Sequence, residues 1–366
     1  MKLVIFGLTI SSSWGNGHAT LWRGLVRALI RRGCRVTFFE RDLPYYAANR
    51  DLNAITGGEL VLYRDWPHVT SRARREITEA DVAIVTSYCP DAIAATEMLA
   101  GLQKPLKVFY DLDTPVTLSR LSGGEDVSYI GPRGLADFEL ALSFTGGAAL
   151  TELKRRLGAA FVAPLYGHVD PDVHHPTAPL PHYIADLSYL GTYAGDRQAS
   201  LQALLITPAM RRPKRRFLIG GAEYPREFPW SSNIYFVRHL PPGEHAAFYS
   251  SSRLTLNITR AAMARMGWCP SGRLFEAAAC GTALLSDRWE GLSAFYTEGS
   301  EILVAQSTED AIAALDLSDA EIGRIARAGR ERTLDEHTSG HRADQLIEIL
   351  TAARSRSGVP REERIA

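Results

Sequence analysis

The sequence predicts an α/β protein with two doubly wound, Rossmann-like domains that face each other across a cleft. Short apolar runs alternate with helical patterns along the whole chain, as they do in parallel sheets covered by helices on both faces. The chain has 366 residues, 46% of them hydrophobic, which is too long for one ordinary core and suits two. Ligands of such domains bind beyond the carboxyl ends of the strands, so we expect the site in the cleft.

The first domain is expected to span residues 1–177, and the second residues 178–339. Seven apolar runs predict strands in the first domain: Lys2–Leu8, Arg35–Glu40, Leu60–Tyr63, Val82–Thr86, Leu106–Tyr110, Leu140–Phe144 and Ala160–Ala163. Six predict strands in the second: Leu187–Leu190, Arg216–Gly220, Asn233–Val237, Leu254–Asn257, Thr282–Ser286 and Ile302–Ala305. A Pro-rich stretch, Pro176 to Pro181, with histidines on both sides of it indicates the linker. A last helix, at about 340–354, has no strand after it, and we expect it to pack back on the first domain.

Charge composition argues against a nucleic-acid partner. Lys and Arg together number 41, as do Asp and Glu, so no overall field attracts a polyanion. The densest basic run, Arg211 to Arg216, precedes an apolar strand without interleaved aromatic residues and is expected to be a solvated turn. No run approaches the ~20 apolar residues of a membrane span, and we expect a cytoplasmic protein.

Neither a disulfide framework nor a metal cofactor is expected. The four cysteines, at positions 34, 89, 269 and 280, form no C-x-x-C pair and are predicted to be buried thiols. The histidines His174, His175 and His182 lie in or beside the linker, and the H-E-x-x-H motif of zinc enzymes is missing from the sequence.

The turn after the first strand is the first candidate site. It contains G-N-G-H, residues 15–18, and leads into an amphipathic stretch. Gly15 and Gly17 allow close approach of a ligand to the backbone, although a simple tight turn explains them equally well. His18 lies at the predicted helix start, where the helix dipole disfavours the imidazolium and leaves a neutral ring able to act as general base.

Two carboxylates follow the fifth strand, in F-Y-D-L-D-T-P. Asp111 and Asp113 are expected at the same edge of the sheet as His18. Asp113 is therefore a candidate to orient and stabilise His18, with Asp111 as the reserve. The alternative is that Asp113 only caps the following helix.

The second domain contains the most informative segment, C-P-S-G-R-L-F-E-A-A-A-C-G, residues 269–281. A helix is predicted to start at Ser271. Its first N–H groups, at Ser271 and Gly272, are expected to bind a diphosphate, with Arg273 or Arg260 adding positive charge. Glu276 lies about one turn further, where a carboxylate can accept hydrogen bonds from two ribose hydroxyls; a surface Glu on a packed helix is the alternative.

Two further segments are candidates for donor binding. Arg197, in G-T-Y-A-G-D-R, is expected to reach the same diphosphate and stabilise the leaving nucleotide, unless it forms a surface salt bridge. Backbone groups of His239 and Leu240, at the end of another strand, are expected to meet the base.

The motifs G-N-G-H-A, D-L-D-T-P-V-T-L, L-Y-G-H-V-D-P-D and S-G-R-L-F-E-A-A-A-C-G together resemble the CgeB-like spore-maturation glycosyltransferases of the glycosyltransferase-B (GT-B) superfamily. The likeness extends from Phe6 to about Arg342. It implies a nucleotide-sugar donor held by the second domain and an acceptor held by the first, with no metal required.

The resemblance leaves the stereochemical outcome open. Retaining members carry E-x7-E, and Glu276 resembles its second glutamate, but Trp268 occupies the first position. Inverting members use a histidine after the first strand and an aspartate about a hundred residues later, which His18 and Asp113 resemble.

We therefore expect a glycosyltransferase that moves a sugar from a nucleoside diphosphate sugar to an unknown acceptor. A sugar-nucleotide 2-epimerase is the second hypothesis, because it shares the two-domain architecture. A non-catalytic surface or assembly protein that retains the fold is the third.

Overall fold

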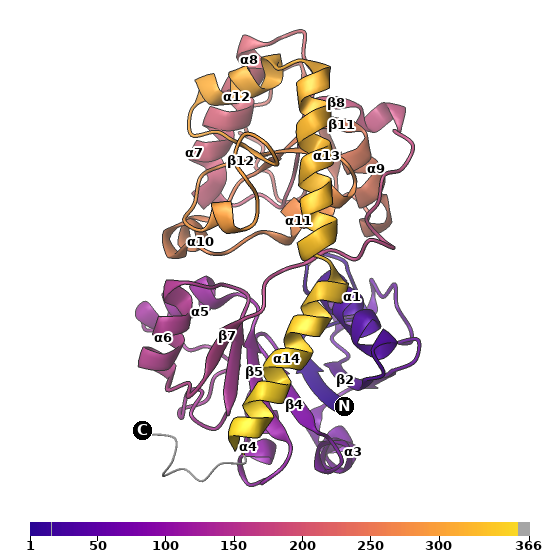
Figure 1. Cartoon of the computed structure of the whole chain (residues 1–366), viewed down its shortest axis with the longest axis vertical. Helices are drawn as coiled ribbons and strands as arrows, with labels where there is room; N and C mark the ends of the chain where they lie inside the picture. Colours follow the sequence, from indigo (N-terminus) through magenta and orange to yellow (C-terminus); the bar gives the residue numbers. More distant parts are fainter. Residues whose placement is uncertain (16, 358–366) are drawn as a thin grey trace. The chain divides into compact units, whose positions relative to one another are not determined.

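The chain folds into two compact units in a computed structural model that describes residues 1–15 and 17–357. One unit combines Met1–Tyr166 with the segment from Ser339 on, and the other is Gly167–Thr338 (Figure 1). We predicted boundaries at 177 and 339. Residues 167–177 instead belong to the second unit, because the Val169 N–H donates to the His337 carbonyl at 3.0 Å and the Thr177 N–H to Ser250 Oγ at 3.1 Å.

The first unit is built on a seven-stranded parallel sheet. Its strands are β1 (Lys2–Gly7), β2 (Arg35–Arg41), β3 (Glu59–Tyr63), β4 (Val82–Thr86), β5 (Leu106–Asp111), β6 (Leu140–Ser143) and β7 (Val162–Pro164), in the order β3-β2-β1-β4-β5-β6-β7. Phe6 of β1 lies between Phe39 of β2 and Val85 of β4. The strand order reverses between β1 and β4, and this is where an open α/β sheet binds its ligand.

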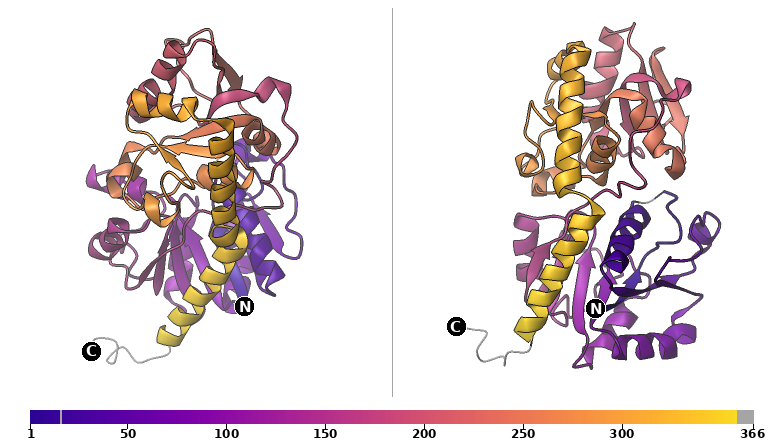
Figure 2. Two further views of the ribbon diagram at one scale, coloured as in Figure 1. Left: turned by 45° about the horizontal axis from the view of Figure 1, so that its top comes forward. Right: turned by 45° about the vertical axis from the view of Figure 1, so that its right-hand side comes forward.

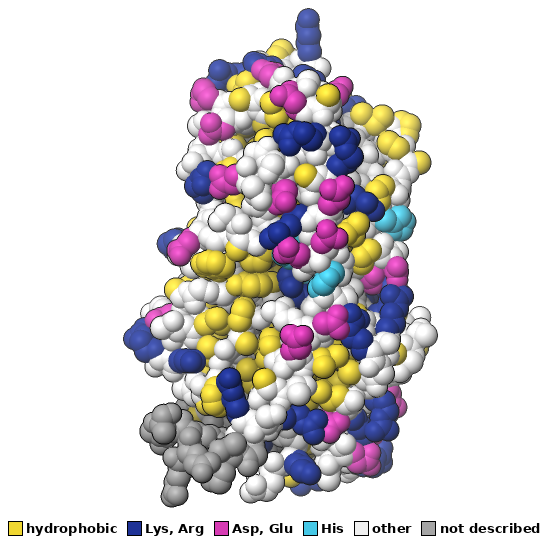
Figure 3. Space-filling view, in the orientation of Figure 1, with side chains coloured by type: hydrophobic (Ala, Val, Ile, Leu, Met, Phe, Trp, Pro, Cys, Tyr) yellow, Lys and Arg dark blue, Asp and Glu magenta, His cyan; other side chains and the backbone are white. Residues whose placement is uncertain are grey.

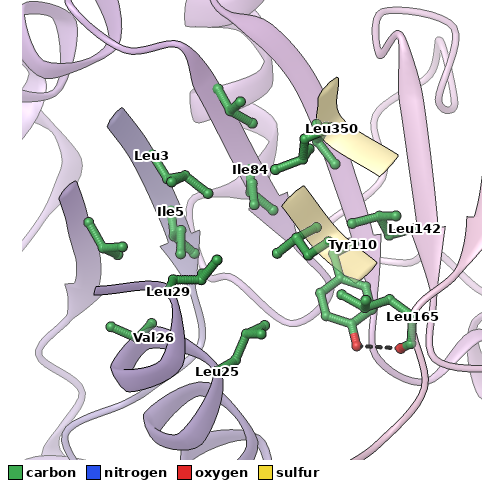
Figure 4. Packing of buried hydrophobic residues seen from close by; sticks show 14 of the residues in the cluster. Leu3, Ile5, Leu25, Val26, Leu29, Ile84, Tyr110, Leu142, Leu165 and Leu350 are labelled. Atoms are coloured by element: carbon green, nitrogen blue, oxygen red, sulfur yellow. Dashed lines mark hydrogen bonds between the residues drawn. The ribbon is translucent and has the colours of Figure 1, made fainter. Parts of the chain in front are cut away.

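Helices cover both faces of this sheet. They are α1 (His18–Arg31), α2 (Pro44–Ala47), α3 (Trp66–Thr78), α4 (Ala92–Ala100), α5 (Thr114–Ser122), α6 (Ala148–Leu157) and α14 (Ser339–Ser357). Helix α14 packs beside α1 (Figure 2). Leu346 and Leu350 of α14 are buried in the same core as Leu3 and Ile5 of β1 (Figure 4). The predicted return of the last helix to the first unit therefore rests on burial of its apolar side chains.

The second unit contains a six-stranded parallel sheet. Its strands are β8 (Ala185–Leu190), β9 (Phe217–Gly221), β10 (Ile234–Arg238), β11 (Ser252–Asn257), β12 (Ala283–Ser286) and β13 (Leu303–Val304), in the order β10-β9-β8-β11-β12-β13. The order reverses between β8 and β11, so this unit also has a switch point. The prediction of two doubly wound sheets with seven and six strands is confirmed.

Three helices of the second unit begin after a serine whose side chain caps them. The helices of this unit are α7 (Gln198–Leu201), which continues through a π-helical turn (Gln202–Ile206) into α8 (Thr207–Arg211), α9 (His245–Ser250), α10 (Ala261–Met266), α11 (Gly272–Ala279), α12 (Thr308–Asp316) and α13 (Asp319–Glu336). Ser307 and Ser318 form capping boxes for α12 and α13. Ser271 caps α11, as predicted, and the helix is followed by Gly281 at φ +78°.

Surface charges of both signs are interspersed on the face shown in Figure 3. The basic run is held by ion pairs: Arg211 with Glu309, Arg212 with Asp316 and Arg215 with Asp186. The four cysteines are buried free thiols, as predicted. Across the described residues, no helix has the length and apolar character needed to cross a membrane.

Candidate functional site

The start of α11 in the second unit presents the groups predicted to bind a diphosphate. Ser271 is the N-cap, and its Oγ accepts a hydrogen bond from the Arg273 N–H at 3.4 Å. Apart from the adjacent residues and the backbone of the helix itself, no described heavy atom lies within 4 Å of the position that a Cβ on Gly272 would take, so the backbone is open to a ligand here. Glu276 follows one turn later on the same helix face and is half-buried.

Two arginines, Arg197 and Arg273, act on the same buried tyrosine near this helix start. Among the described residues, neither Arg197 nor Arg273 has a carboxylate oxygen within 4.0 Å. Arg197 is only 9% exposed; its Nη2 donates to the Thr192 carbonyl at 2.6 Å, and its Nε has no partner in the described part of the chain. Burial raises the pKa of Tyr189, and the positive charges of Arg197 and Arg273 oppose that rise, so both act on one side chain. A buried cation with no carboxylate within ion-pair distance favours binding of an anion.

Arg260, the other predicted phosphate ligand, is neutralised in the structure. Its Nε lies 3.2 Å from Asp196 Oδ2, and the same oxygen accepts the Ala261 N–H at 3.0 Å. Asp196 is adjacent to Arg197 in sequence, but its carboxylate pairs with Arg260. Arg197 has no carboxylate within ion-pair distance among the described residues.

Two tyrosines not predicted from the sequence add polar groups here. The hydroxyls of Tyr189 and Tyr249 are buried and make no hydrogen bond to any described residue. Tyr249 and Arg273 line a cavity of ≈ 10 Å³, which has room for one water molecule. Unpaired buried hydroxyls cost roughly 1–3 kcal/mol each unless water or a ligand satisfies them.

Glu276 is accompanied by two histidines, which the sequence analysis had assigned no role. Potential ligand atoms of His174, His245 and Glu276 all lie within 4.8 Å of one another. His245 is the first residue of α9, and His174 lies in the segment before β8. Burial lowers the pKa of His245 to about 4; the charge of Glu276 opposes this shift, whereas His174 and Arg273 reinforce it.

The end of β10 is already occupied by internal hydrogen bonds. The His239 N–H donates to the Gly221 carbonyl at 2.9 Å, and His239 has φ +51°. The backbone of Leu240 accepts a hydrogen bond from the His245 ring. The His239 N–H is therefore not free to contact a nucleotide base as predicted. At Leu240, a base would have to compete with the His245 ring for the backbone group.

Trp268, at the position of the first glutamate in E-x7-E, packs on a glycine. It has φ +48°, its N–H donates to the Glu290 carbonyl at 2.6 Å, and a Cβ on Gly291 would lie 2.6 Å from its ring. Among the described residues, four non-glycine residues have positive φ, and three of them, Tyr88, His239 and Trp268, flank candidate site residues. Such strain is concentrated at functional sites.

In the first unit, the loop that leads to His18 is fixed by a buried carboxylate. Glu40, the penultimate residue of β2, accepts hydrogen bonds from Thr9 Oγ1 (2.8 Å), the Ile10 N–H (2.7 Å), and the Ser11 N–H (2.9 Å) and Oγ (2.6 Å). Asp51 holds a further residue of the loop, Ser13, at its N–H (3.0 Å). The sequence signal for Glu40 is an acidic residue at the end of a largely apolar strand.

The glycines beside His18 differ in their constraints. Gly15 has φ +71°, and a Cβ there would lie 2.7 Å from Tyr45 Oη, so this position requires glycine. Gly17 is the N-cap of α1 at an ordinary φ of −82°, and, its chain neighbours aside, no heavy atom of the described residues lies within 4 Å of the position its Cβ would take. An open, uncapped helix start is thus presented immediately before His18.

Tyr88 provides the contact between His18 and Asp113. The rings of His18 and Tyr88 have centroids 5.5 Å apart, and Tyr88 Oη donates to Asp113 Oδ2 at 2.9 Å. In the sheet, β4 lies between β1 and β5. Tyr88, which follows β4, therefore lies between His18, which follows β1, and Asp113, which follows β5. Burial lowers the pKa of His18 to about 4, which keeps the ring neutral at physiological pH. His18 Nδ1 has no hydrogen-bond partner among the described residues.

Asp113 is at the N-cap position of α5, but its side chain makes no capping hydrogen bond. Asp111, the reserve candidate, is fully buried. Burial raises the pKa of Asp111 to about 6, and the charge of Asp113 adds to the rise. Asp111 Oδ1 accepts the Asp113 N–H at 3.0 Å and Thr117 Oγ1 at 3.1 Å. Its Oδ2 has no partner in the described part of the chain. Asp111 thus supports the turn that carries Asp113.

Comparison with family models finds a match that covers most of the second unit and the first part of α14. A family model described as "Glycosyl transferase-like" matches residues 197–348, which include Arg197, Arg273 and Glu276. No curated protein matches the chain in sequence.

Solved structures establish the fold. Sucrose-phosphate synthase from Thermosynechococcus elongatus superposes with a TM-score of 0.69 at 13% identity, over 97% of this chain and 99% of that one. An alpha-glucosyltransferase (AGT) in complex with UDP gives 0.69 at 13% identity, over 96% and 100%. Anabaena HepE in complex with UDP and glucose gives 0.63 at 11% identity, over 96% and 100%. The chain has the GT-B fold.

A further solved structure with this fold is described as a putative UDP-N-acetylglucosamine 2-epimerase from Listeria monocytogenes. It gives a TM-score of 0.57 at 14% identity, over 97% of each chain. The fold alone therefore does not separate transfer from epimerisation.

Proposed function

We propose that this chain is a glycosyltransferase that moves a sugar from a nucleoside diphosphate sugar to a hydroxyl or amine acceptor. The donor is assigned to the second unit and the acceptor to the first. Within the GT-B fold we group the chain with the CgeB-like glycosyltransferases, on the motifs quoted above.

The observation that carries the proposal is the buried guanidinium of Arg197. It is 9% exposed, without a carboxylate partner among the described residues, and acts on the same tyrosine as Arg273 at the start of α11. A diphosphate supplies the missing anion, since arginine binds phosphate oxygens with paired, charge-assisted hydrogen bonds. The open helix start at Gly272 adds backbone donors.

Glu276 is proposed to bind the ribose of the donor. It is half-buried, one turn beyond the phosphate groups, and its carboxylate can accept from two vicinal hydroxyls. In the transfer step, the acceptor loses its proton to a base, its oxygen or nitrogen bonds to the sugar carbon, and the nucleoside diphosphate leaves with its charge stabilised by Arg197 and Arg273.

His18 is proposed to be the base that takes the acceptor proton. Its ring is neutral at physiological pH because burial lowers its pKa to about 4, and the loop that carries it is fixed by Glu40. Asp113 is proposed to act on His18 through Tyr88, whose ring packs on the imidazole and whose hydroxyl bonds to the carboxylate. Asp113 and Tyr88 are thus positioning residues.

Calorimetric titration of the full chain with nucleoside diphosphates tests donor binding. UDP is the first probe, because two of the superposed structures contain it, followed by ADP, GDP and dTDP. We expect Glu276→Ala to weaken nucleotide binding about ten- to hundredfold, since hydrogen bonds to a charged group contribute roughly 1.5–3 kcal/mol. Glu331→Ala, an exposed glutamate on α13, is the matched control. Unchanged affinity of Glu276→Ala for every nucleotide that the parent binds contradicts the proposal.

A sugar-nucleotide 2-epimerase is the second candidate, favoured by the superposition on the Listeria structure. Incubation of the protein with donor alone separates the two. An epimerase converts the donor to its 2-epimer without an acceptor, whereas a transferase leaves the donor sugar unchanged or hydrolyses it slowly.

A further inference from the structure

Three side chains that commonly ligate metals converge in the second unit, each from a different segment. His174 comes from the segment before β8, His245 from the start of α9, and Glu276 from the middle of α11. Their potential ligand atoms all lie within 4.8 Å of one another. Ligand atoms around a tetrahedral zinc ion lie about 3.4 Å apart, given bonds of about 2.0–2.1 Å. The three ligand atoms must therefore approach one another by up to about 1.4 Å to bind a zinc ion.

His174 is the residue that most needs a partner. It is 3% exposed, and neither Nδ1 nor Nε2 forms a hydrogen bond to any of the described residues. Burying two unpaired polar ring atoms is costly. The backbone fixes the ring near its neighbours: the His174 N–H donates to the Asp170 carbonyl at 2.9 Å, and the Thr177 N–H donates to Ser250 Oγ at the end of α9. Metal coordination gives a buried imidazole of this kind a bond that the described protein groups do not.

His245 has the arrangement expected of a metal-bound imidazole. The ring donates a hydrogen bond to the backbone of Leu240. Metal-ligating histidines usually donate their second ring N–H to a carbonyl or carboxylate, and this contact fixes the orientation of the ring. The centroids of the His245 and His174 rings are 6.4 Å apart.

We propose that His174, His245 and Glu276 form a binding site for a divalent transition metal ion, with zinc as the ion that the two-histidine, one-carboxylate set suits well. Three protein ligands leave a fourth position for water. The donors are imidazole nitrogen and carboxylate oxygen, which select Zn²⁺ and its neighbours in the first transition series over Mg²⁺ and Ca²⁺. The sequence predicted no metal because the three ligands are separated by long stretches of chain.

Arg273 distinguishes this site from the nucleotide site. Its exposed guanidinium acts electrostatically on His245, so it opposes a bound cation and favours a bound anion. Removal of this charge in Arg273→Gln is expected to tighten zinc binding severalfold and to weaken UDP binding. The proposed metal site depends only on its three ligands. We also expect zinc and nucleotide to compete for Glu276, and this second expectation rests on the proposed function.

Zinc titration of the tag-free full chain, after removal of metal with a chelator, tests the proposal. We expect one zinc ion per chain in competition with a chromophoric chelator, and at least a tenfold loss of affinity in His174→Gln and in His245→Gln. His175→Gln is the matched control, because His175 is the adjacent exposed histidine outside the cluster, and its zinc affinity should equal that of the parent.

Cobalt provides a second readout. Co²⁺ bound to the parent should give the visible absorption bands of low-coordinate cobalt, and His174→Gln should lose them. Far-ultraviolet circular dichroism checks the fold of each variant; if His174→Gln does not fold, His245→Gln carries the test. The proposal is overturned if the parent binds no zinc at 100 µM free metal, on the order of the weakest meaningful sites, or if both His variants bind it as tightly as the parent. If the parent binds zinc but does not bind UDP or any other nucleoside diphosphate, that result would count against the proposed function alone.

Discussion

Replacement of Asp111 by asparagine should change how the stability of the protein depends on pH. Asp111 is fully buried, and burial raises its pKa from the ordinary 3.8 to about 6. The folded state therefore binds the proton more tightly than the unfolded state. Below pH 3.8 the carboxyl is protonated in both states and costs nothing. As pH rises from 3.8 through 6, the folded state is progressively destabilised relative to the unfolded state, and above 6 the penalty is complete.

The size of the effect follows from the two pKa values. The full penalty is about 3 kcal/mol, and about 2 kcal/mol of it develops between pH 4.5 and pH 7.5. The asparagine side chain of the Asp111→Asn variant stays neutral at both pH values, so the free energy of unfolding of the variant, relative to the parent, should rise by about 2 kcal/mol over this interval. Differences in hydrogen bonding between the amide and the carboxyl shift both measurements equally and cancel.

Urea unfolding followed by circular dichroism at pH 4.5 and 7.5 measures this difference. Asp126→Asn, on an exposed residue of the same unit, is the control and should follow the parent at both pH values. Parallel pH profiles of Asp111→Asn and the parent would refute the reasoning, because they would mean that the Asp111 carboxyl titrates alike in the folded and unfolded states.

Three further predictions concern the first unit. Glu40→Gln should lower the free energy of unfolding by about 2–3 kcal/mol, because an amide cannot accept all four hydrogen bonds that the buried carboxylate accepts; equal urea midpoints for variant and parent would contradict this. Tyr88→Phe should lower the turnover number about tenfold without changing UDP affinity, since it removes only the hydroxyl that bonds to Asp113; an unchanged turnover number would exclude Asp113 as a positioning residue. His18→Ala should abolish turnover and spare UDP binding. Because a base must be deprotonated and burial lowers the His18 pKa to about 4, the kcat/KM of the parent should stay level from pH 8 to about 5 and decline only towards pH 4. Full activity of the variant, or a decline of the parent's kcat/KM centred near pH 6.5, would exclude His18 as the base.

The strands and the key helix could be predicted from the sequence because their signals are local. Apolar runs bounded by helical patterns identified the strands of both sheets. Ser271 and Gly281 marked the ends of α11, since a cap and a left-handed residue are requirements of the helix itself. The position of Glu276, about one turn beyond the start of α11, followed from its spacing in the sequence.

Contacts that depend on strand order could not be predicted in the same way. Tyr88 lies between His18 and Asp113 because β4 is inserted between β1 and β5, and a list of strands in chain order does not contain that fact. Arg260 and Arg197 are similar as sequence features, yet Asp196 pairs with Arg260 and leaves Arg197 without an acidic partner among the described residues.

The two histidines beside Glu276 illustrate the same limit. His174 was assigned to a linker because proline and histidine surround it, whereas the hydrogen bonds of residues 167–177 bring it into the second unit. One strand, β11, and one helix, α10, separate α9, which begins at His245, from α11, which contains Glu276. Sequence spacing can identify metal ligands on one helix or one turn, but not ligands contributed by three separate elements.

The proposed donor site requires a diphosphate bound at the start of α11 with a pentose at Glu276. A crystal structure of the full chain with UDP tests this most directly. We predict phosphate oxygens within hydrogen-bonding distance of Arg197 and the Gly272 N–H, and both ribose hydroxyls on the Glu276 carboxylate. A nucleotide bound elsewhere, with Arg197 still without an anion, would contradict the account.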